Sequence, residues 1–477
     1  MTISSRPIGQ DPVSQQLWRI SKQMEQLIGV VARIVPTTTT TSTSTSTSTS
    51  TSTTTSTSTT TSTTTTALPI IQGAYYLAPT GDDITGDGTS TTPWFTLNKA
   101  WTVIGAGDTV YLRGGTYAHN SQQYLTGKNG TVTNPINILA YPNETPVISK
   151  SISYTEPTGK GIIFTGDYFR WKGISVTGFV QIAVDEWPRP FHAVDCAYCT
   201  FEQMDIHHNG WGFELGQSAG SSKVTTGNLF LNCDFHHNYD PLTTDAYGNA
   251  DGLDLGNMTC TGATNTVRGC RFYSNSDDGI DLWSNDGTVI MENCWAFSNG
   301  YREDGVTTGG DGNGFKLGSS TINRSTEVTR ILNNCIAVTN RFIGIIENAV
   351  LGKTQAYNNT IYLNAYGIKL SSSIAHIIKN SIAYNNSGYD VDLGSNVVTA
   401  TNSWVGTTDV PAIAITNADF VSLDLTLLLT ARQANGDLPI TNFLRLANGS
   451  ALIDAGTDVG LPYTGTAPDI GAYESIP

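Results

Sequence analysis

Acidic and basic residues recur at matching positions of three short segments. The segments are D-G-L-D-L (251–255), D-D-G-I-D-L (277–282) and N-G-F-K-L (313–317). Aligned on their glycines, they form one column of Asp251, Asp278 and Asn313, and a second column of Asp254, Asp281 and Lys316. If the segments are stacked strands, neighbouring side chains in a column lie about 4.8 Å apart. Carboxylates at that separation, beside an amine, are a candidate for metal-assisted acid–base chemistry.

Four aspartates fall on two adjacent segments: Asp251, Asp277, Asp278 and Asp281. Carboxylates this close repel one another unless a cation neutralises them. A site made only of oxygen ligands suits Ca²⁺, which takes six to eight of them. Isolated aspartates near glycine usually mark turns, and we interpret Asp82, Asp83 and Asp87 as a loop. The four clustered aspartates come from independent segments in register, so the sequence predicts a calcium site.

Lys316 is the basic residue of the outward column. It is predicted to stand one strand from Asp281 and two strands from Asp254. Side chains alternate between the faces of a strand, so Lys316 points outward where Leu317 points inward. Two interpretations remain open from the residues alone: Lys316 is a catalytic base, or it is a surface lysine paired with Asp281.

Composition narrows the classes of partner. The net charge is −15, which argues against nucleic acid because phosphate binding needs Lys and Arg. An acidic polysaccharide also fits poorly unless a metal ion bridges it to the protein. No run of 18 apolar residues predicts a membrane span, and residues 1–16 lack the apolar core of a signal peptide. Action outside a cell would therefore require another export route.

The central part of the chain repeats a strand pattern that ends in a turn asparagine. The turn residues are Asn209, Asn238, Asn275, Asn299, Asn340, Asn364 and Asn385. Five positions earlier stand Met204, Cys233, Cys270, Cys294, Cys335, Asn359 and Asn380, which we expect to face inward. The stacked cysteines predict buried thiols and no disulfide network. The histidine pairs 207–208 and 236–237 precede turn asparagines, and we assign them to the same stack.

A second strand follows each turn. Its outward position reads Glu214, Asp254, Asp281, Lys316, Ile346, Lys369 and Asp392 along the repeats. Short strands in every repeat, an asparagine ladder and loops of variable length predict an all-β fold, a right-handed parallel β-helix. Residues 67–400 are predicted to form this domain and 401–477 its C-terminal end or cap. An amphipathic helix at 94–104 is expected to cover its open N-terminal end.

The N-terminal segment has a different organisation. Residues 13–34 carry apolar residues in a heptad pattern that predicts a short coiled coil, and its β-branched positions favour a trimer. An amphipathic helix docked on another protein explains the same pattern. Residues 37–66 contain only Thr and Ser and predict a disordered linker. We therefore expect residues 1–36 to oligomerise or anchor the protein at the end of a tether.

Several motifs resemble polysaccharide lyase family 9, the β-helix pectate lyases. They are N-S-D-D-G-I-D-L (275–282), N-C-W-A-F-S-N-G (293–300) and G-D-G-N-G-F-K-L-G (310–318), supported by Y-Y-L-A-P-T-G (75–81), G-D-T-V-Y-L-R-G-G-T-Y (107–117), S-A-L-I-D-A-G (450–456) and P-D-I-G-A-Y-E (468–474). The resemblance covers about residues 74–477. It implies a Ca²⁺ ion held by Asp251, Asp277, Asp278 and Asp281, and Lys316 as the base that takes a proton from the sugar. Asp254 has no assigned role.

The resemblance implies β-elimination on a uronic-acid polysaccharide such as pectate. Residues 1–66 fall outside it and are instead similar to the anchoring region of a phage virion protein, so we expect action outside the cell without a classical signal peptide, in a virion or after secretion. One alternative is a β-helix glycoside hydrolase that uses Asp277 and Asp278, although the G-H-G and R-I-K patterns of polygalacturonases are missing. The other is a carbohydrate-binding spike or fibre protein without activity.

Overall fold

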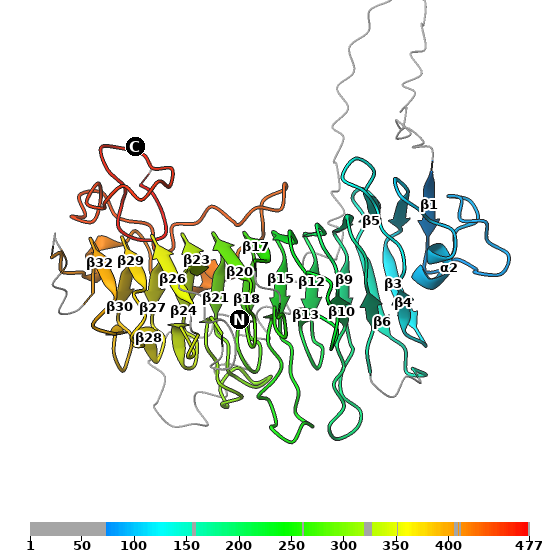
Figure 1. The fold of residues 1–477 in the computed structure, drawn as a ribbon, viewed down its shortest axis with the longest axis horizontal. Coiled ribbons are helices and arrows are strands. Elements are labelled where there is room, and N and C mark those ends of the chain that lie inside the picture. The colour runs from blue at the N-terminus through cyan, green and yellow to red at the C-terminus, as the bar shows by residue number, and fades with distance from the viewer. Residues whose placement is uncertain are drawn as a thin grey trace, which may run out of the picture. The chain divides into compact units, whose positions relative to one another are not determined.

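The protein forms a right-handed parallel β-helix, as the sequence predicts (Figure 1). The computed structural model describes residues 73–154, 159–259, 262–318, 327–350, 352–404, 409 and 412–475. Ten coils contribute one strand to each of three parallel sheets, and the first sheet has one further strand at each end. Within those ranges, no helix is long and apolar enough to span a membrane. The predicted N-terminal coiled coil and the Ser/Thr linker lie outside the described residues.

The first sheet has twelve strands and extends along the whole stack. Its strands are β1 (Ala74–Leu77), β2 (Thr109–Leu112), β5 (Ile136–Ala140), β8 (Phe169–Lys172), β11 (Thr200–Glu202), β14 (Leu229–Leu231), β17 (Thr264–Arg268), β20 (Thr288–Glu292), β23 (Val328–Asn333), β26 (Lys353–Tyr357), β29 (Ile377–Lys379) and β32 (Val398–Ala400). The repeat pattern in the sequence identifies two strands in each coil, so most of this sheet is an addition to the prediction.

The second sheet contains the strands that precede the turn asparagines. They are β3 (Gly115–His119), β6 (Pro146–Lys150), β9 (Ser175–Thr177), β12 (Asp205–His207), β15 (Asp234–His236), β18 (Arg271–Tyr273), β21 (Trp295–Phe297), β24 (Ile336–Val338), β27 (Thr360–Tyr362) and β30 (Ile382–Tyr384). Each is three to five residues long, and the inward residue of each is buried in the core.

The third sheet follows the asparagine turns and holds the candidate site. Its strands are β4 (Gln123–Leu125), β7 (Ile162–Phe164), β10 (Phe191–Val194), β13 (Phe213–Gly216), β16 (Leu253–Asp254), β19 (Ile280–Asp281), β22 (Phe315–Lys316), β25 (Ile343–Ile346), β28 (Tyr366–Leu370) and β31 (Val391–Leu393). The strands pair in the register that the sequence predicts for the outward column.

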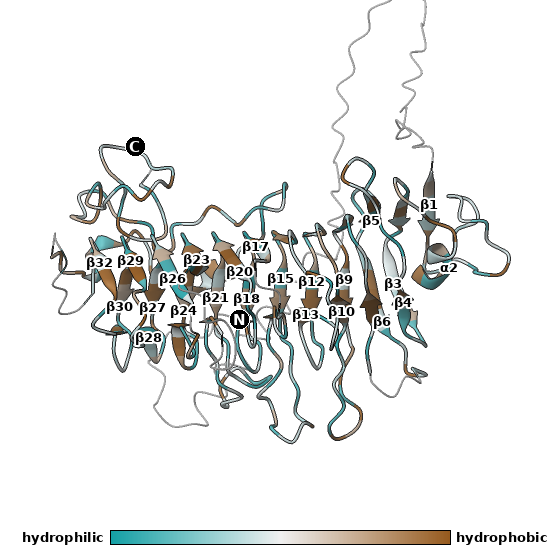
Figure 2. Cartoon of the chain, viewed as in Figure 1, coloured by the Kyte–Doolittle hydropathy of each residue, from teal (hydrophilic) through white to brown (hydrophobic). Residues whose placement is uncertain are grey.

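Apolar residues of all three sheets fill the interior of the stack, and in Figure 2 the hydrophobic colour concentrates in the strands. The predicted cysteine column lies in this core, and the six described cysteines are buried and free. The backbone N–H of Cys233 donates to Cys270 Sγ at 3.4 Å, as expected for residues on successive coils. The prediction of a thiol stack is therefore confirmed for Cys233, Cys270, Cys294 and Cys335.

Buried asparagines form a ladder along the turn between the second and third sheets. Each side-chain Nδ2 donates to the side-chain Oδ1 of the next asparagine, from Asn209 through Asn238, Asn275, Asn299, Asn340 and Asn364. The last member is Asn386, which accepts from Asn364 at 3.1 Å. The prediction of Asn385 in that position is wrong.

The error is a shift of one residue in the final coil. Strand β30 pairs with β27 so that Ala383 lies opposite Ile361, and Asn380 donates to Asn358 instead of lying opposite Asn359. Asn385 has a left-handed φ of 58° and precedes the ladder residue. Two Asn-Asn pairs in the sequence, 358–359 and 385–386, allow either register.

A short helix covers the N-terminal end of the stack. Helix α2 (Leu97–Trp101) is shorter than the predicted helix because Thr96 ends the preceding extended chain and caps it, accepting from the N–H of Lys99. Leu97, Ala100 and Trp101 are buried on the face that packs against β1 and β4. The amphipathic face is therefore as predicted.

The chain after β32 runs back along the outer face of the second sheet. It contains the 3-10 helices η1 (Asn417–Asp419) and η2 (Leu425–Leu429) and a second apolar cluster around Phe443 and Leu452. Arg432 forms an ion pair with Asp234 at 2.7 Å. This return segment therefore ties the end of the chain to coils near its middle.

Candidate active site

The candidate site lies on the outer face of the third sheet. Lys316 pairs in register with Asp281, Asp281 with Asp254, and Asp254 with Glu214. The four side chains belong to successive coils, and all four residues are buried to at least nine-tenths. The structure thus confirms the predicted outward column and places Lys316 one strand from Asp281 and two strands from Asp254.

The turn before each strand positions the second acidic column. The N–H of Asp278 donates to Asp251 Oδ1 at 3.0 Å, and the N–H of Asn313 donates to Asp278 Oδ1 at 2.6 Å. The glycine after Asp278 is required by close packing, because a Cβ on Gly279 would lie 2.6 Å from the carbonyl oxygen of Gly314. The repeated Asp-Gly pattern therefore holds carboxylates in line on neighbouring coils.

Lys316 joins the two columns. Its Nζ lies 2.8 Å from Asp278 Oδ2 and 3.0 Å from Asp281 Oδ2. Carboxylate oxygens of Asp251, Asp278 and Asp281 lie within 4.8 Å of one another, as do those of Asp277, Asp278 and Asp311. All five site residues predicted from the sequence are thus brought together, with Asp278 shared by both groups.

Three carboxyl groups of this cluster, those of Asp251, Asp277 and Asp281, have raised pKa values. Burial raises the pKa of Asp251 well above its ordinary value, and the charges of Asp277 and Asp281 raise it further. Burial and the neighbouring Asp278 likewise raise the pKa of Asp277. Burial raises the pKa of Asp281 to about 6, although the charge of Lys316 opposes this shift. Burial is thus the main cause of the three raised pKa values, and repulsion between the aspartates adds to it.

The lysine experiences opposing influences. Burial lowers the pKa of Lys316, but the negative charges of Asp278 and Asp281 outweigh burial, and the pKa stands well above its ordinary value. The ammonium form is consequently favoured when these carboxylates are ionised and nothing else neutralises them.

The donor set fits a hard cation. Asp281 Oδ1 is buried and makes no hydrogen bond among the described residues, and Asp278 Oδ2 is contacted by Lys316 Nζ at 2.8 Å. Every candidate ligand is a carboxylate oxygen, which suits Ca²⁺ better than a transition metal that prefers nitrogen or sulfur. The residues present therefore match the ion that the sequence analysis predicts.

Asp311 is a site residue that the sequence analysis missed. Its Oδ2 lies 3.4 Å from Lys316 Nζ, and its side chain is 64% exposed. The loop is held from the next coil, because Arg341 Nη1 donates to the carbonyl oxygens of Gly310 and Asp311. Asp311 lies inside the G-D-G-N-G motif (310–314), which the sequence analysis identified. The sequence does not indicate that the Asp311 side chain points towards Lys316.

The cluster opens into a pocket of about 600 Å³. Trp283 lies at its side with 48% of its surface exposed, and Lys316 Nζ lies 6.0 Å from the centre of its ring. Asp254 also lines the pocket, with a buried Oδ1 that has no hydrogen-bond partner within the described ranges. Burial and the charge of Glu214 raise the pKa of Asp254.

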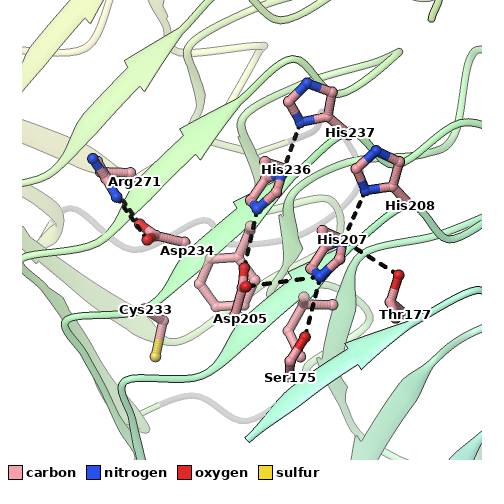
Figure 3. A network of polar contacts seen from close by, with 12 residues as sticks. Ser175, Thr177, Asp205, His207, His208, Cys233, Asp234, His236, His237 and Arg271 are labelled. Atoms are coloured by element: carbon pink, nitrogen blue, oxygen red, sulfur yellow. Dashed lines mark hydrogen bonds and ion pairs between the residues drawn. The ribbon is translucent and has the colours of Figure 1, made fainter. Parts of the chain in front are cut away.

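The histidine pairs belong to the stack, as predicted: His207 and His236 end strands β12 and β15 of the second sheet, and His208 and His237 follow them (Figure 3). The rings of His207 and His236 stack at 4.9 Å, and those of His208 and His237 at 5.0 Å. Asp205 connects the two coils, accepting from His236 Nε2 at 3.0 Å. These residues do not line the pocket that holds Lys316.

Comparison with known proteins agrees with this geometry. A family model described as Pel9A-like, right handed beta helix region matches residues 75–373. Pectate lyase L of Dickeya chrysanthemi is 32% identical over 420 residues, which cover 84% of this chain and 90% of that protein. Pectate lyase L of Paenibacillus polymyxa is 32% identical over 401 residues, covering 81% of this chain and 84% of that protein.

Two solved structures share the fold over most of the chain. Pectate lyase Pel9A matches with a TM-score of 0.68 and 30% identity, covering 84% of this chain and 96% of that one. A rhamnogalacturonan lyase matches with a TM-score of 0.67 and 27% identity, covering 79% and 96%. The resemblance to polysaccharide lyase family 9 is thereby confirmed. The chain is a polysaccharide lyase and belongs to the Pel9A-like right-handed β-helix family.

Proposed function

We propose that the protein cleaves a galacturonate-containing polysaccharide by calcium-dependent β-elimination, with Lys316 as the base. One observation carries the proposal: Lys316 Nζ lies within 3.0 Å of two aspartates, Asp278 and Asp281, and lines an open pocket. The pectate lyases among the relatives support pectate as the first substrate to test.

Asp251, Asp277, Asp278 and Asp281 would hold the calcium ion. When bound, the ion supplies positive charge that neutralises these carboxylates and the uronate carboxylate of the substrate. This explains how a chain of net charge −15 can bind an acidic polymer. Asp311, exposed at the mouth of the same cluster, would contribute a further carboxylate oxygen.

Lys316 would remove the proton at C5 of the uronate, which is acidic because it lies next to the carboxylate. The electron pair left at C5 forms the C4–C5 double bond as the glycosidic oxygen leaves C4. A lysine can act as a base only when it is neutral, and the surrounding aspartates favour its ammonium form. Neutralising those aspartates lowers the pKa of Lys316, so activity should require calcium and favour alkaline pH.

The alternatives receive less support. A glycoside hydrolase needs two carboxyl groups on opposite sides of the scissile bond, about 5–9 Å apart. Asp277 and Asp278 are adjacent in one turn and belong to a single cluster with Asp311, in which one oxygen of each residue lies within 4.8 Å of the others. A purely binding role for a spike or fibre leaves the buried Lys316 among these aspartates without a purpose.

The proposed activity is tested by measuring the ultraviolet absorbance of the unsaturated uronate that β-elimination produces. Purified protein is incubated with pectate and with rhamnogalacturonan, each with added calcium or with EDTA. Calcium-dependent absorbance supports the proposal and identifies the better substrate. New reducing ends without absorbance would indicate a hydrolase, and neither signal on any uronic polymer would indicate a binding protein.

The proposal for the N-terminus is separate. Residues 1–36 would form a coiled-coil trimer or attach the enzyme to a larger assembly, such as a phage virion, and residues 37–66 would act as the tether. The catalytic unit would then act outside the cell, in a virion or after secretion. The heptad pattern at 13–34 and the uniform Ser/Thr composition of 37–66 support this arrangement.

A further inference from the structure

The pocket that holds Lys316 continues beyond the aspartate cluster towards the N-terminal coils, where Arg189 and Trp211 line it. Glu214 lies three strands from Lys316 in the paired register, a distance of about 14 Å at the usual strand spacing. Three cationic side chains line this pocket among the described residues, namely Arg189, Lys316 and Arg341. Arg341 is engaged by loop carbonyl groups near Lys316, whereas Arg189 stands at the far end.

The guanidinium of Arg189 is held in a fixed orientation. Its Nε forms an ion pair with Glu214 Oε2, which His192 Nδ1 also contacts at 2.5 Å. Its Cζ lies 4.7 Å from the centre of the Trp211 ring, and Trp187 supports that ring at 5.5 Å. One edge and one face of the guanidinium are thus occupied.

The remaining edge of Arg189 is available to a ligand. Its ion pair with Glu214 uses Nε and leaves the Nη groups outside that contact, and the side chain is 20% exposed and lines the pocket. Lys160 adds positive charge close to Arg189 and Glu214. A guanidinium edge that is pre-oriented in this way matches the two oxygens of a carboxylate.

We propose that Arg189 forms a remote subsite that binds the carboxylate of a uronate unit several sugars away from the bond that is cleaved. This inference deepens the proposed function and rests on it. Glu214 and Trp211 are positioning residues for Arg189, and they do not contact the reacting atoms. The subsite would favour long acidic chains that extend over the N-terminal coils, and it would add affinity away from the calcium cluster.

The kinetic test uses the full chain and galacturonate oligomers of graded length. Arg189→Gln should raise KM on long oligomers about tenfold or more while kcat changes little. The difference from the wild type should shrink as the oligomers become too short to reach from Lys316 to Arg189. Arg189→Lys keeps the charge and the pairing with Glu214 but loses the two parallel N–H donors. Its KM on long oligomers should therefore lie between those of the wild type and Arg189→Gln.

Arg170→Gln is the matched control. Arg170 also pairs with a glutamate, Glu202, at 2.5 Å, but it lies on β8 of the first sheet, outside the groove. The Arg170→Gln variant should show the same dependence of KM on oligomer length as the wild type. An unchanged KM for Arg189→Gln on long oligomers, or an equal loss on all lengths, would overturn the subsite.

A binding measurement separates this inference from the proposed activity. Calorimetry with Lys316→Ala, with and without Arg189→Gln, compares the affinity for long and short galacturonate oligomers. A loss of affinity confined to long oligomers supports the subsite, and equal affinities overturn it. If the wild type yields no unsaturated product, the proposed function fails, and this comparison still decides the role of Arg189.

Discussion

Lys316 Nζ lies 2.8 Å from Asp278 Oδ2, although the two residues come from successive coils of the stack. The ion pair exists because the Asp-Gly turn of one coil and the strand of the next meet at the same edge of the third sheet. A lysine held this way is poised between two roles. As an ammonium ion it offsets part of the negative charge of the cluster, and under the proposed mechanism it would accept a proton once another cation neutralises the cluster.

Replacing Lys316 tests its role as the base. Lys316→Ala should lower kcat by roughly 10²–10⁴-fold or more, the usual contribution of general base catalysis. Lys316→Arg should be equally impaired, since a guanidinium does not deprotonate near neutral pH. Lys369→Ala is the control, because Lys369 lies in the same outward column two strands further along. An active Lys316→Ala enzyme would exclude the mechanism and leave the fold and metal site standing.

Replacing Asp277 and Asp278 together with Asn tests the metal site. The double variant should lose calcium binding by calorimetry and calcium-dependent turnover, because it removes two charged ligands while keeping their shape. Asp392→Asn, in the same outward column at the far end of the sheet, should bind calcium as the wild type does. Calcium affinity that survives in the double variant would refute this ligand set.

The stability of the calcium-free protein should depend on pH with a defined sign. The pKa of Asp281 is raised from 3.8 to about 6 in the folded state, so folding is favoured by its protonation. That contribution is complete below about pH 4 and is lost as the pH rises through about 6. Melting temperature in EDTA should therefore fall between these values, and added calcium should restore it most at the higher pH. A melting temperature that rises over this interval would contradict the raised pKa.

Asp311→Asn should change the pH dependence of the rate. The wild-type rate should climb with pH and level off as Lys316 loses its proton, and calcium should move the midpoint downward. Removing the Asp311 charge 3.4 Å away should lower the pKa of Lys316 and shift the midpoint towards acid. The shift should be a fraction of a pH unit, since Asp311 is largely exposed and screened. A midpoint that moves towards alkaline pH would count against Lys316 as the titrating base.

A truncated protein beginning at Ala67 tests the tether. It should keep the turnover of the full chain, because the proposed base and calcium ligands lie between positions 251 and 316 and the proposed Arg189 subsite also follows Ala67. It should also lose any trimer or attachment, as judged by size-exclusion chromatography with light scattering. Loss of turnover in a folded truncated protein would contradict a purely anchoring role for residues 1–36.

The sequence predicted most of the fold because stacking transmits one register through many coils. Once the asparagine turns are aligned, the positions of Asp254, Asp281 and Lys316 relative to one another follow without any structure. The same reasoning failed where the pattern is degenerate, at Asn385 and Asn386, because adjacent identical residues fit the ladder in either register.

Residues outside the strict repeat could not be placed in the same way. Asp311 and Arg189 approach the site from loops, whose direction depends on packing and not on strand periodicity. Arg341 donates a hydrogen bond to the backbone carbonyl of Asp311 and so holds the loop beside Lys316. Arg189 is held by its ion pair with Glu214 and its contact with the Trp211 ring. These contacts form between side chains of different coils, so the pattern of a single repeat does not predict them.

The return segment along the second sheet changes how the molecule should fold. In a plain stack each coil touches only its neighbours, so the ends can unravel independently. Here Arg432 forms an ion pair with Asp234, and Gln203 donates a hydrogen bond to the carbonyl oxygen of Asn435. Residues near the end of the chain therefore stabilise coils that lie much earlier in the sequence. Coils that would otherwise melt one by one are thereby coupled into a cooperative unit, which reaches full kinetic stability only after the last residues have been synthesised and have docked.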